Sequence, residues 1–420
     1  MSTLAYSTGK PRRARRRGFT LVELMVAITG GLFVSIIVFT LAKHSANFYQ
    51  SEQRIGEATL GGMVGFERLR NDIARASFLS SPNLIKDPRV CGKPPEIAGF
   101  PALLENLTNV VITRNATSST SRTQDTILLT GSYSSIDSFS MAAFSRTGNG
   151  AGPSLFLNEN SLAMERLGYD PSASPAAKSA ALTALFRTAR AVRIVDRTGR
   201  HYYSVISGVN TNAAGAPEIM LRAAPAIILP GFGNFCSLDN CEGCSVNVVN
   251  FIRYDVARVA SADYAPLYAD GGVAAPFDDT RTELRRVELD VDGNVIAGTE
   301  ELVAQYAVDL KFGLLVERVT GGVPGLSTID FDDDEIDSFA GPPDTAHPEL
   351  IRGVRVRFAV RSRDADREVD IDPASLGLPD GLYRIGLGPN GTAPFARVRT
   401  FQADVVLNNM SSAMGITWPP

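Results

Sequence analysis

The longest apolar segment of the chain runs from Phe19 to Leu41, and Glu23 is the only ionisable residue among its 23 positions. As a helix rising about 1.5 Å per residue, this segment would be about 35 Å long. That length is sufficient to cross a hydrocarbon core of about 30 Å. The pattern therefore predicts a membrane-spanning helix over residues 19–42.

Helical periodicity continues beyond the apolar segment. Phe66, Leu69, Ile73 and Ala76 fall on one helical face, the spacing of a helix that buries one side. The charged residues that lie largely off this face are Glu67, Arg68, Arg70, Asp72 and Arg75. No proline occurs from residue 12 to residue 81, and Pro82 stops the pattern.

We therefore expect one helix over residues 19–79, with residues 43–80 beyond the membrane and their apolar face packed on the protein's own sheet. Three glycines interrupt this helix, Gly61, Gly62 and Gly65. Each costs about 1 kcal/mol relative to alanine in a helix interior. They indicate a weak or bent point, or a close contact with another helix.

The rest of the chain contains short apolar segments separated by turn-forming residues, a pattern typical of strands. Val354, Val356, Phe358 and Val360 alternate with polar residues and predict a half-buried strand over 354–362. The residues expected to face solvent there are Arg355, Arg357 and Arg361. The other predicted strands are 109–114, 126–130, 190–196, 201–206, 246–254, 283–291, 305–316 and, less regularly, 398–407.

The expected fold is α+β, with a long N-terminal helix packed on an antiparallel β-sheet body over residues 81–420. Glycine and proline number 37 and 24 of 420 residues, which favours a body rich in turns over a helical bundle. Residues 115–245 are rich in Ser, Thr, Ala and Gly and are interpreted as a β-rich insertion with little pattern.

The first 18 residues are strongly basic. They carry six basic residues and no acidic one: Lys10, Arg12, Arg13, Arg15, Arg16 and Arg17. The net charge of the whole chain is −4, so residues 19–420 carry −10. The positive-inside rule leaves the basic segment in the cytoplasm and places the body outside it. A mildly acidic body without a basic stripe argues against nucleic acid as the main partner.

Three interpretations of this N-terminus compete. A secretory signal would end at a small-residue site such as Thr40-Leu41-Ala42, but its apolar region is normally about 7–15 residues and carries no acid. A plain membrane anchor explains the length and not Glu23. A carboxylate inside a membrane helix costs roughly 2.5–3.5 kcal/mol at mid-bilayer and marks a functional residue that needs a partner. Cleavage before Phe19 would supply that partner as a free amine on a neighbouring, staggered subunit.

The segment Arg17-Gly18-Phe19-Thr20-Leu21-Val22-Glu23, followed by the apolar run, resembles the class III signal of type IV prepilins and type II secretion pseudopilins. The resemblance implies that prepilin peptidase removes residues 1–18 by cutting after Gly18. It also implies N-methylation of the new terminus at Phe19 and a role for Glu23 in subunit assembly.

A second resemblance is more diffuse. Residues 66–76 are similar to the end of the long helix in PilW-type minor pilins and J-type pseudopilins. The order of apolar and charged residues over 284–286, 301–303, 308–312 and 354–362 is similar to the C-terminal half of PilW-type proteins. It implies a minor pilin, with other minor pilins and the major pilin as partners.

The four cysteines are Cys91, Cys236, Cys241 and Cys244. Only the last three lie close in sequence, and no histidine is near them, so a structural zinc site lacks its fourth ligand. An even number in a chain that enters an oxidising periplasm favours disulfides. Cys91 would then pair with one of the other three, and sequence leaves all three connectivities open.

Two further patterns point to ligands. The acidic run 330–337 supplies Asp330, Asp332 and Asp334 as a calcium candidate, although the spacing of an EF-hand is missing and a solvated loop is the ordinary interpretation. Residues 386–391 fit G-x-G-x-x-G, but Pro389 and Pro394 forbid the helix of a dinucleotide site, so we expect a hairpin turn. No catalytic motif is present, and we expect neither an enzyme nor a required cofactor.

These patterns predict a minor pilin of a type IV pilus, held in the inner membrane by a single span with a periplasmic body. After processing it would enter or prime the filament, and its bulky body favours a place near the tip. A type II secretion pseudopilin, or an adhesin or binding module displayed at the tip, are the alternatives.

Overall fold

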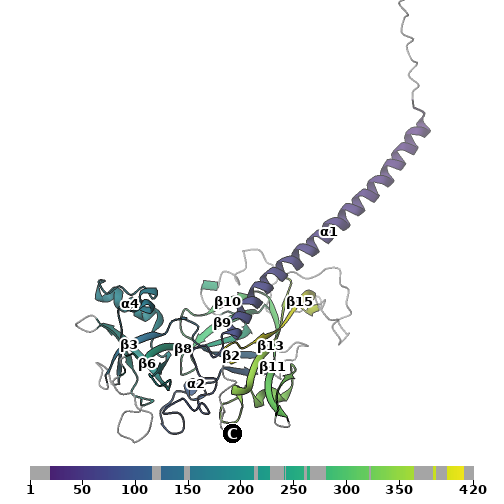
Figure 1. Cartoon of the computed structure of the whole chain (residues 1–420). Coiled ribbons are helices and arrows are strands. Elements are labelled where there is room, and N and C mark those ends of the chain that lie inside the picture. Colours follow the sequence, from purple (N-terminus) through teal and green to yellow (C-terminus); the bar gives the residue numbers. More distant parts are fainter. Residues whose placement is uncertain are drawn as a thin grey trace, which may run out of the picture. The chain divides into compact units, whose positions relative to one another are not determined.

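The structure is a computed structural model that describes residues 19–115, 124–145, 152–211, 216–227, 241, 243–259, 263–264, 281–320, 323–363, 382–384 and 395–410. The chain divides into two units, Met1–Arg54 and Ile55–Pro420. One long helix and antiparallel sheets make up the fold (Figure 1), which confirms the predicted α+β class.

Helix α1 spans Leu21–Ala74 and is 54 residues long. The predicted end near residue 79 is five residues too far. Ser77 and Leu79 adopt left-handed backbone conformations with φ of 64° and 51°, and the Ser77 amide donates to the carbonyl of Thr130 at 2.7 Å. Pro82 therefore sets only an upper limit, because a contact with the body ends the helix first.

The predicted apolar face of α1 is buried. Phe66, Leu69, Ile73 and Ala76 are at most 5% exposed and belong to one core with residues of both sheets. The Phe66 ring stacks on Phe401 with the ring centroids 5.7 Å apart. This confirms that the outer part of the helix packs on the protein's own sheets.

Two of the helical glycines mark a close approach of helix to sheet, and not of helix to helix. A Cβ atom added at Gly62 would lie 2.7 Å from Cε2 of Phe401, and one at Gly65 would lie 2.6 Å from Cβ of Ala304. At Gly61 an added Cβ would meet nothing within 4 Å. The cost of the first two glycines in helix propensity is offset by closer packing.

Asp72 departs from the pattern, because it lies off the apolar face and is still only 2% exposed. Its Oδ2 atom accepts hydrogen bonds from Nε of Arg286 and from the hydroxyl of Tyr254, both at 2.8 Å. Its backbone carbonyl accepts from the Tyr133 hydroxyl at 2.9 Å. Burial raises the pKa of Tyr254, so this phenol stays a hydrogen-bond donor.

A five-stranded antiparallel sheet forms one side of the core. Its order is β12-β11-β13-β15-β14, that is, Val323–Ile329, Ala307–Thr320, Ile351–Arg361, Phe395–Val406 and Leu382–Arg384. Phe358 of β13 pairs with Phe401 of β15, and Val356 pairs with Phe312 of β11. These residues alternate as predicted, so their apolar sides face the core.

Arg361 contradicts the expected solvent-facing row of arginines. Arg355 and Arg357 are partly exposed, but Arg361 is 1% exposed. Its guanidinium carbon lies 4.9 Å from the ring centroid of Tyr306 and 5.8 Å from that of Tyr383. The aromatic faces attract the cation and let it be buried at the end of the strand.

A ten-stranded antiparallel sheet contains the remaining strands. They are β1 (Val110–Thr113), β2 (Thr126–Gly131), β3 (Phe139–Ser145), β4 (Ser154–Leu157), β5 (Ala191–Val195), β6 (His201–Thr211), β7 (Pro217–Leu221), β8 (Ser245–Ala257), β9 (Glu283–Leu289) and β10 (Glu301–Ala304). The 13-residue strand β8 divides its pairing. Its first part pairs with β3 and β5, and its second part pairs with β2 and β9.

Six of these strands close into a barrel, because β8 pairs with β3 and also with β5 at the other end of the order β3-β4-β7-β6-β5. Closure leaves no free edge among the six strands. The barrel has its own core, which includes Phe139, Leu155 and Ile219. Helices α3 (Leu162–Arg166) and α4 (Pro175–Leu185) contribute to that core.

The barrel confirms that residues 115–245 are rich in strands, and the predicted strands 190–196, 201–206 and 246–254 correspond to β5, β6 and β8. It corrects only the expectation that this segment has little pattern. Short segments complete the fold: α2 (Ala102–Glu105) and the 3₁₀ helices η2 (Asp334–Ser338) and η3 (Pro348–Leu350). The G-x-G-x-x-G segment at 386–391 lies outside the described residues.

Candidate processing and assembly site

The residues predicted to carry processing and assembly lie at the start of α1. Gly18 is outside the described residues, and Phe19 is 86% exposed. Thr20 precedes the first helical residue, Leu21, and its carbonyl accepts the first helical hydrogen bond, from the Leu24 amide at 3.1 Å. Thr20 is therefore the N-cap of the helix.

Glu23 forms a reciprocal cap with Thr20. Its Oε2 atom accepts from the Thr20 amide at 2.9 Å and from the Thr20 hydroxyl at 3.0 Å. The Glu23 amide donates in return to the Thr20 hydroxyl oxygen at 3.2 Å. This is a capping box, in which two otherwise unpaired backbone donors are satisfied at the helix start.

The capping role was missed in the sequence, although the T-x-x-E spacing of Thr20 and Glu23 is its signature. The capping box gives the Glu23 carboxylate a structural role within its own chain, as the acceptor for Thr20. Any pairing with an amine of another subunit would have to displace or share these hydrogen bonds.

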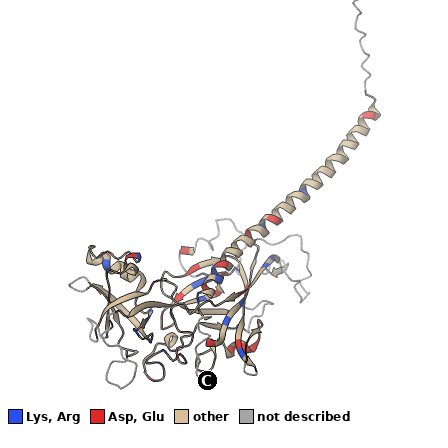
Figure 2. Cartoon of the chain, in the orientation of Figure 1, with Lys and Arg blue, Asp and Glu red and all other residues tan. Residues whose placement is uncertain are grey.

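Beyond Glu23, α1 carries no charged side chain until Lys43 (Figure 2). Its hydroxyl groups are satisfied within the helix: Thr29 donates to the Met25 carbonyl at 2.9 Å and Ser35 to the Gly31 carbonyl at 2.8 Å. This is how polar side chains are accommodated where water is absent.

Among the described residues, α1 is the one helix long and apolar enough to cross a membrane. No part of its most apolar stretch is buried against the rest of the protein. The large apolar side chains between Leu21 and Leu41 are all more than half exposed. An apolar surface of this extent requires lipid or other protein to cover it, so the helix has the character of a membrane anchor.

The disulfide prediction is partly tested. Cys241 and Cys244 are bonded to each other, with their Cα atoms 5.1 Å apart. Cys91 is also disulfide-bonded and is 5% exposed, while Cys236 lies outside the described residues. No free cysteine occurs in the part of the chain that the structure describes.

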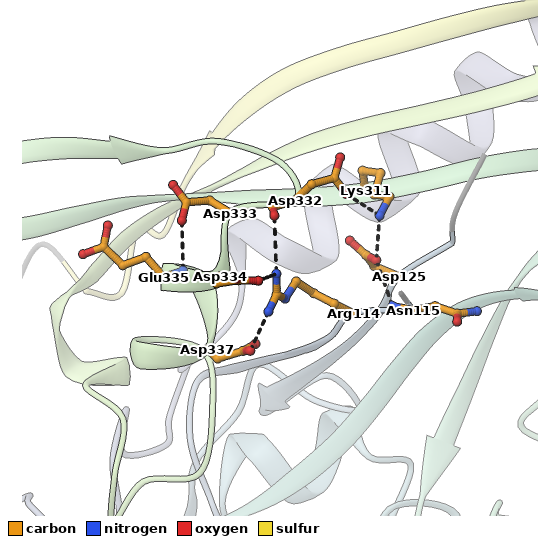
Figure 3. Close-up of polar contacts among 9 residues, drawn as sticks. All are labelled: Arg114, Asn115, Asp125, Lys311, Asp332, Asp333, Asp334, Glu335 and Asp337. Carbon is orange, nitrogen blue, oxygen red and sulfur yellow. Dashed lines mark hydrogen bonds and ion pairs between the residues drawn. The ribbon is translucent and has the colours of Figure 1, made fainter. Parts of the chain in front are cut away.

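The three aspartates proposed for calcium each contact a different basic side chain, and Figure 3 shows the contacts of Asp332 and Asp334. Asp330 pairs with Arg355, Asp332 with Lys311 at 2.5 Å, and Asp334 with Arg114 at 2.7 Å. The described residues contain no group of three or more His, Cys, Asp or Glu side chains arranged to hold a metal ion. Calcium binding by these aspartates stays a prediction.

Comparison with known proteins identifies one feature. Residues 13–29 match the family model of the prokaryotic N-terminal methylation motif. No curated protein matches the chain, and no solved structure does. The matched residues include the last four arginines of the basic segment, Gly18, Phe19 and Glu23, so the N-terminus carries a motif of the type IV prepilin kind.

Proposed function

We propose that this chain is a minor pilin of a type IV pilus. Prepilin peptidase cuts between Gly18 and Phe19, and Phe19 is then N-methylated. Residues 19–42 hold the subunit in the inner membrane, with residues 43–80 and the body, 81–420, in the periplasm. The methylation motif at residues 13–29 is the single observation that supports this proposal most strongly.

The start of α1 supports the assembly step. Cleavage would leave the Phe19 amine directly beside the Thr20–Glu23 capping box, so one terminus would hold both a cation and a carboxylate. A carboxylate that is expensive in lipid gains most from a cation on a neighbouring helix. In the filament, Glu23 pairs with the amine of the adjacent subunit and sets the axial stagger.

The size of the body supports a place at the tip or in priming. A filament shaft repeats one subunit many times, and a body of this extent would crowd its neighbours. Residues of α1 share one core with residues of β9, β10, β11 and β13, the strands that carry the order similar to PilW-type minor pilins, and this supports the proposal of a minor pilin. The other minor pilins and the major pilin are the proposed partners.

A second candidate function rests on the barrel, which has its own core and shares strand β8 with the part of the sheet that packs on α1. It would suit a binding module displayed at the tip or a pseudopilin that contacts cargo. Deleting the gene separates these roles. Loss of pili supports assembly, whereas intact pili with lost adhesion or lost secretion supports the second candidate.

Two substitutions of Glu23 test the assembly role in cells that make the filament. Glu23→Gln keeps a side-chain oxygen that can accept from Thr20, since glutamine also serves in capping boxes, but it removes the charge. We expect Glu23→Gln and Glu23→Ala to be processed, inserted and absent from sheared filaments. Incorporation of Glu23→Gln at the wild-type level would show that the cap, and not the charge, is what assembly needs.

A further inference from the structure

Lys311 of β11 is buried between two carboxylates (Figure 3). Its side chain is 4% exposed, and that of Asp125 is fully buried. The Lys311 Nζ atom lies 3.2 Å from Oδ1 of Asp125 and 2.5 Å from Oδ1 of Asp332. Asp332 is 59% exposed, so the group links the interior to solvent.

The backbone fixes all three side chains. The Asp125 amide donates to the Leu310 carbonyl at 2.7 Å, next to a parallel bridge between Gln124 and Leu310. Lys311 follows Leu310 in β11. Asp332 has a φ of 68°, a left-handed conformation that directs its side chain to Lys311. A strained conformation of this kind persists only where its surroundings hold it.

One carboxylate would be enough to neutralise the Lys311 ammonium, so charge neutralisation does not explain why both Asp125 and Asp332 contact it. The neighbouring carboxylates of the acidic run have their own partner, because Arg114 binds Asp334 and Asp337, each at 2.7 Å. A buried lysine–aspartate ion pair is also weak support for stability, since desolvation offsets much of the attraction.

We propose that Lys311 and Asp125 condense into an intramolecular amide cross-link, with Asp332 as the proton carrier. The Lys311 Nζ atom is held in hydrogen-bond contact with Oδ1 of Asp125, one bond away from the Cγ atom that it would attack, so the two groups are already positioned to react. Burial raises the pKa of Asp125 and favours its neutral acid, which is the electrophilic form.

The step balances without any external reagent. The Lys311 ammonium passes one proton to the Asp332 carboxylate, and the free amine attacks Cγ of the protonated Asp125 carboxyl. The new C–N bond forms as the C–O bond breaks. The departing hydroxyl takes a proton back from Asp332 and leaves as water, while the nitrogen loses its second proton to solvent through the regenerated carboxylate.

The amide product is neutral where the buried Lys311 cation stood before, so the cost of keeping that charge away from water disappears. The cross-link would join residues 186 positions apart in sequence. It would also tie the strand that follows Asp125, β2 of the ten-stranded sheet, to β11 of the five-stranded sheet. A covalent tie across so long a loop stabilises by restricting the unfolded chain.

Peptide mapping of the full chain, purified in detergent and digested with trypsin, tests the proposal. Trypsin does not cut after an acylated lysine. We expect residues 123–146 joined to residues 287–318, with Lys311 uncut and the mass of one water missing from the sum of the two peptides. Quantitative recovery of residues 123–146 and 287–311 as separate peptides would overturn the cross-link.

Two variants serve as controls. Lys311→Arg keeps the positive charge but cannot condense, so its digest should contain no linked peptide. Asp332→Asn keeps the shape of the proton carrier and removes its basicity, so freshly made protein should contain a several-fold smaller linked fraction. An Asp332→Asn protein that links as completely as the wild type would contradict the role given to Asp332.

Discussion

The buried carboxylate of Asp72 makes a quantitative prediction about how the outer part of α1 is held on the sheets. Asp72 is 2% exposed and Arg286 has only 13% of its side chain exposed. Replacing Asp72 by alanine would leave the Arg286 guanidinium buried and would leave the Tyr254 hydroxyl without its acceptor. Removing one partner of a buried ion pair typically costs about 3–5 kcal/mol.

The local geometry points to the lower part of that range. Arg286 has a second carboxylate nearby, because its Nη1 atom lies 3.7 Å from Glu301. We therefore expect Asp72→Ala to lower the free energy of unfolding by about 3 kcal/mol. Asp72→Asn keeps an acceptor for both partners and loses only the charge, so its cost should be about 1–1.5 kcal/mol, the difference between a hydrogen bond to a charged group and one between neutral groups.

The matched control lies on the same helix. Glu67 pairs with Arg70 at 2.5 Å, but both side chains are well exposed, at 45% and 39%. Exposed pairs contribute about 0–1 kcal/mol, so Glu67→Ala should change stability little. Urea titration of the full chain in detergent, followed by circular dichroism of the β-rich body, gives each free energy. An Asp72→Ala cost within about 0.5 kcal/mol of the Glu67→Ala cost would refute this reasoning.

Two more predictions concern packing and pH. Gly62→Leu should lower the free energy of unfolding by about 1–3 kcal/mol, because the added atoms have no room beside Phe401. Gly61→Ala should raise it by about 0.5–1 kcal/mol. Equal urea midpoints for the two variants would contradict the close approach at Gly62. Burial beside Arg193 lowers the pKa of His201 to about 3. Below about pH 6.5 this histidine therefore binds a proton in the unfolded chain but not in the folded chain. The free energy of unfolding should fall by about 2 kcal/mol between pH 7 and pH 5 because of this histidine. In His201→Gln that part of the pH dependence should be absent.

Elements with strong periodicity were predictable from sequence. Two patterns repeat over several turns or residues: the apolar helical face from Phe66 to Ala76 and the strand alternation from Val354 to Val360. The apolar residues of both are buried. The prediction failed where one residue is decided by a distant partner. Arg361 continues the arginine row in sequence, and only Tyr306 and Tyr383, brought close by the fold, make it a buried residue.

The closure of the barrel and its strands β3, β4 and β7 were missed, whereas β5, β6 and β8 were predicted. Strand β4 has four residues, too few to show an alternation, and its pairing with β3 and β7 is set by the closed barrel. Helix α4 did carry a signal: Ser174 accepts from the Ala177 amide as N-cap, and Pro175 follows at the first helical position. Composition rich in Ser and Ala concealed this start.

At the N-terminus, the sequence identified the motif at residues 13–29 correctly. It did not identify the capping box, because Glu23 was interpreted only for what it offers a neighbouring subunit and Thr20 only as part of the motif. The cap and the proposed pairing both use the Glu23 side chain: the cap needs a side-chain oxygen, which glutamine also supplies, and the pairing needs the negative charge.

The mass of the mature N-terminal peptide tests the central claim most directly. Protein extracted from membranes that contain prepilin peptidase should begin at Phe19 and carry one methyl group on its amine. The apolar segment should remain attached to the body. A mature chain that begins at Lys43 would contradict the account, because it would show that ordinary secretion removes the very helix on which assembly depends.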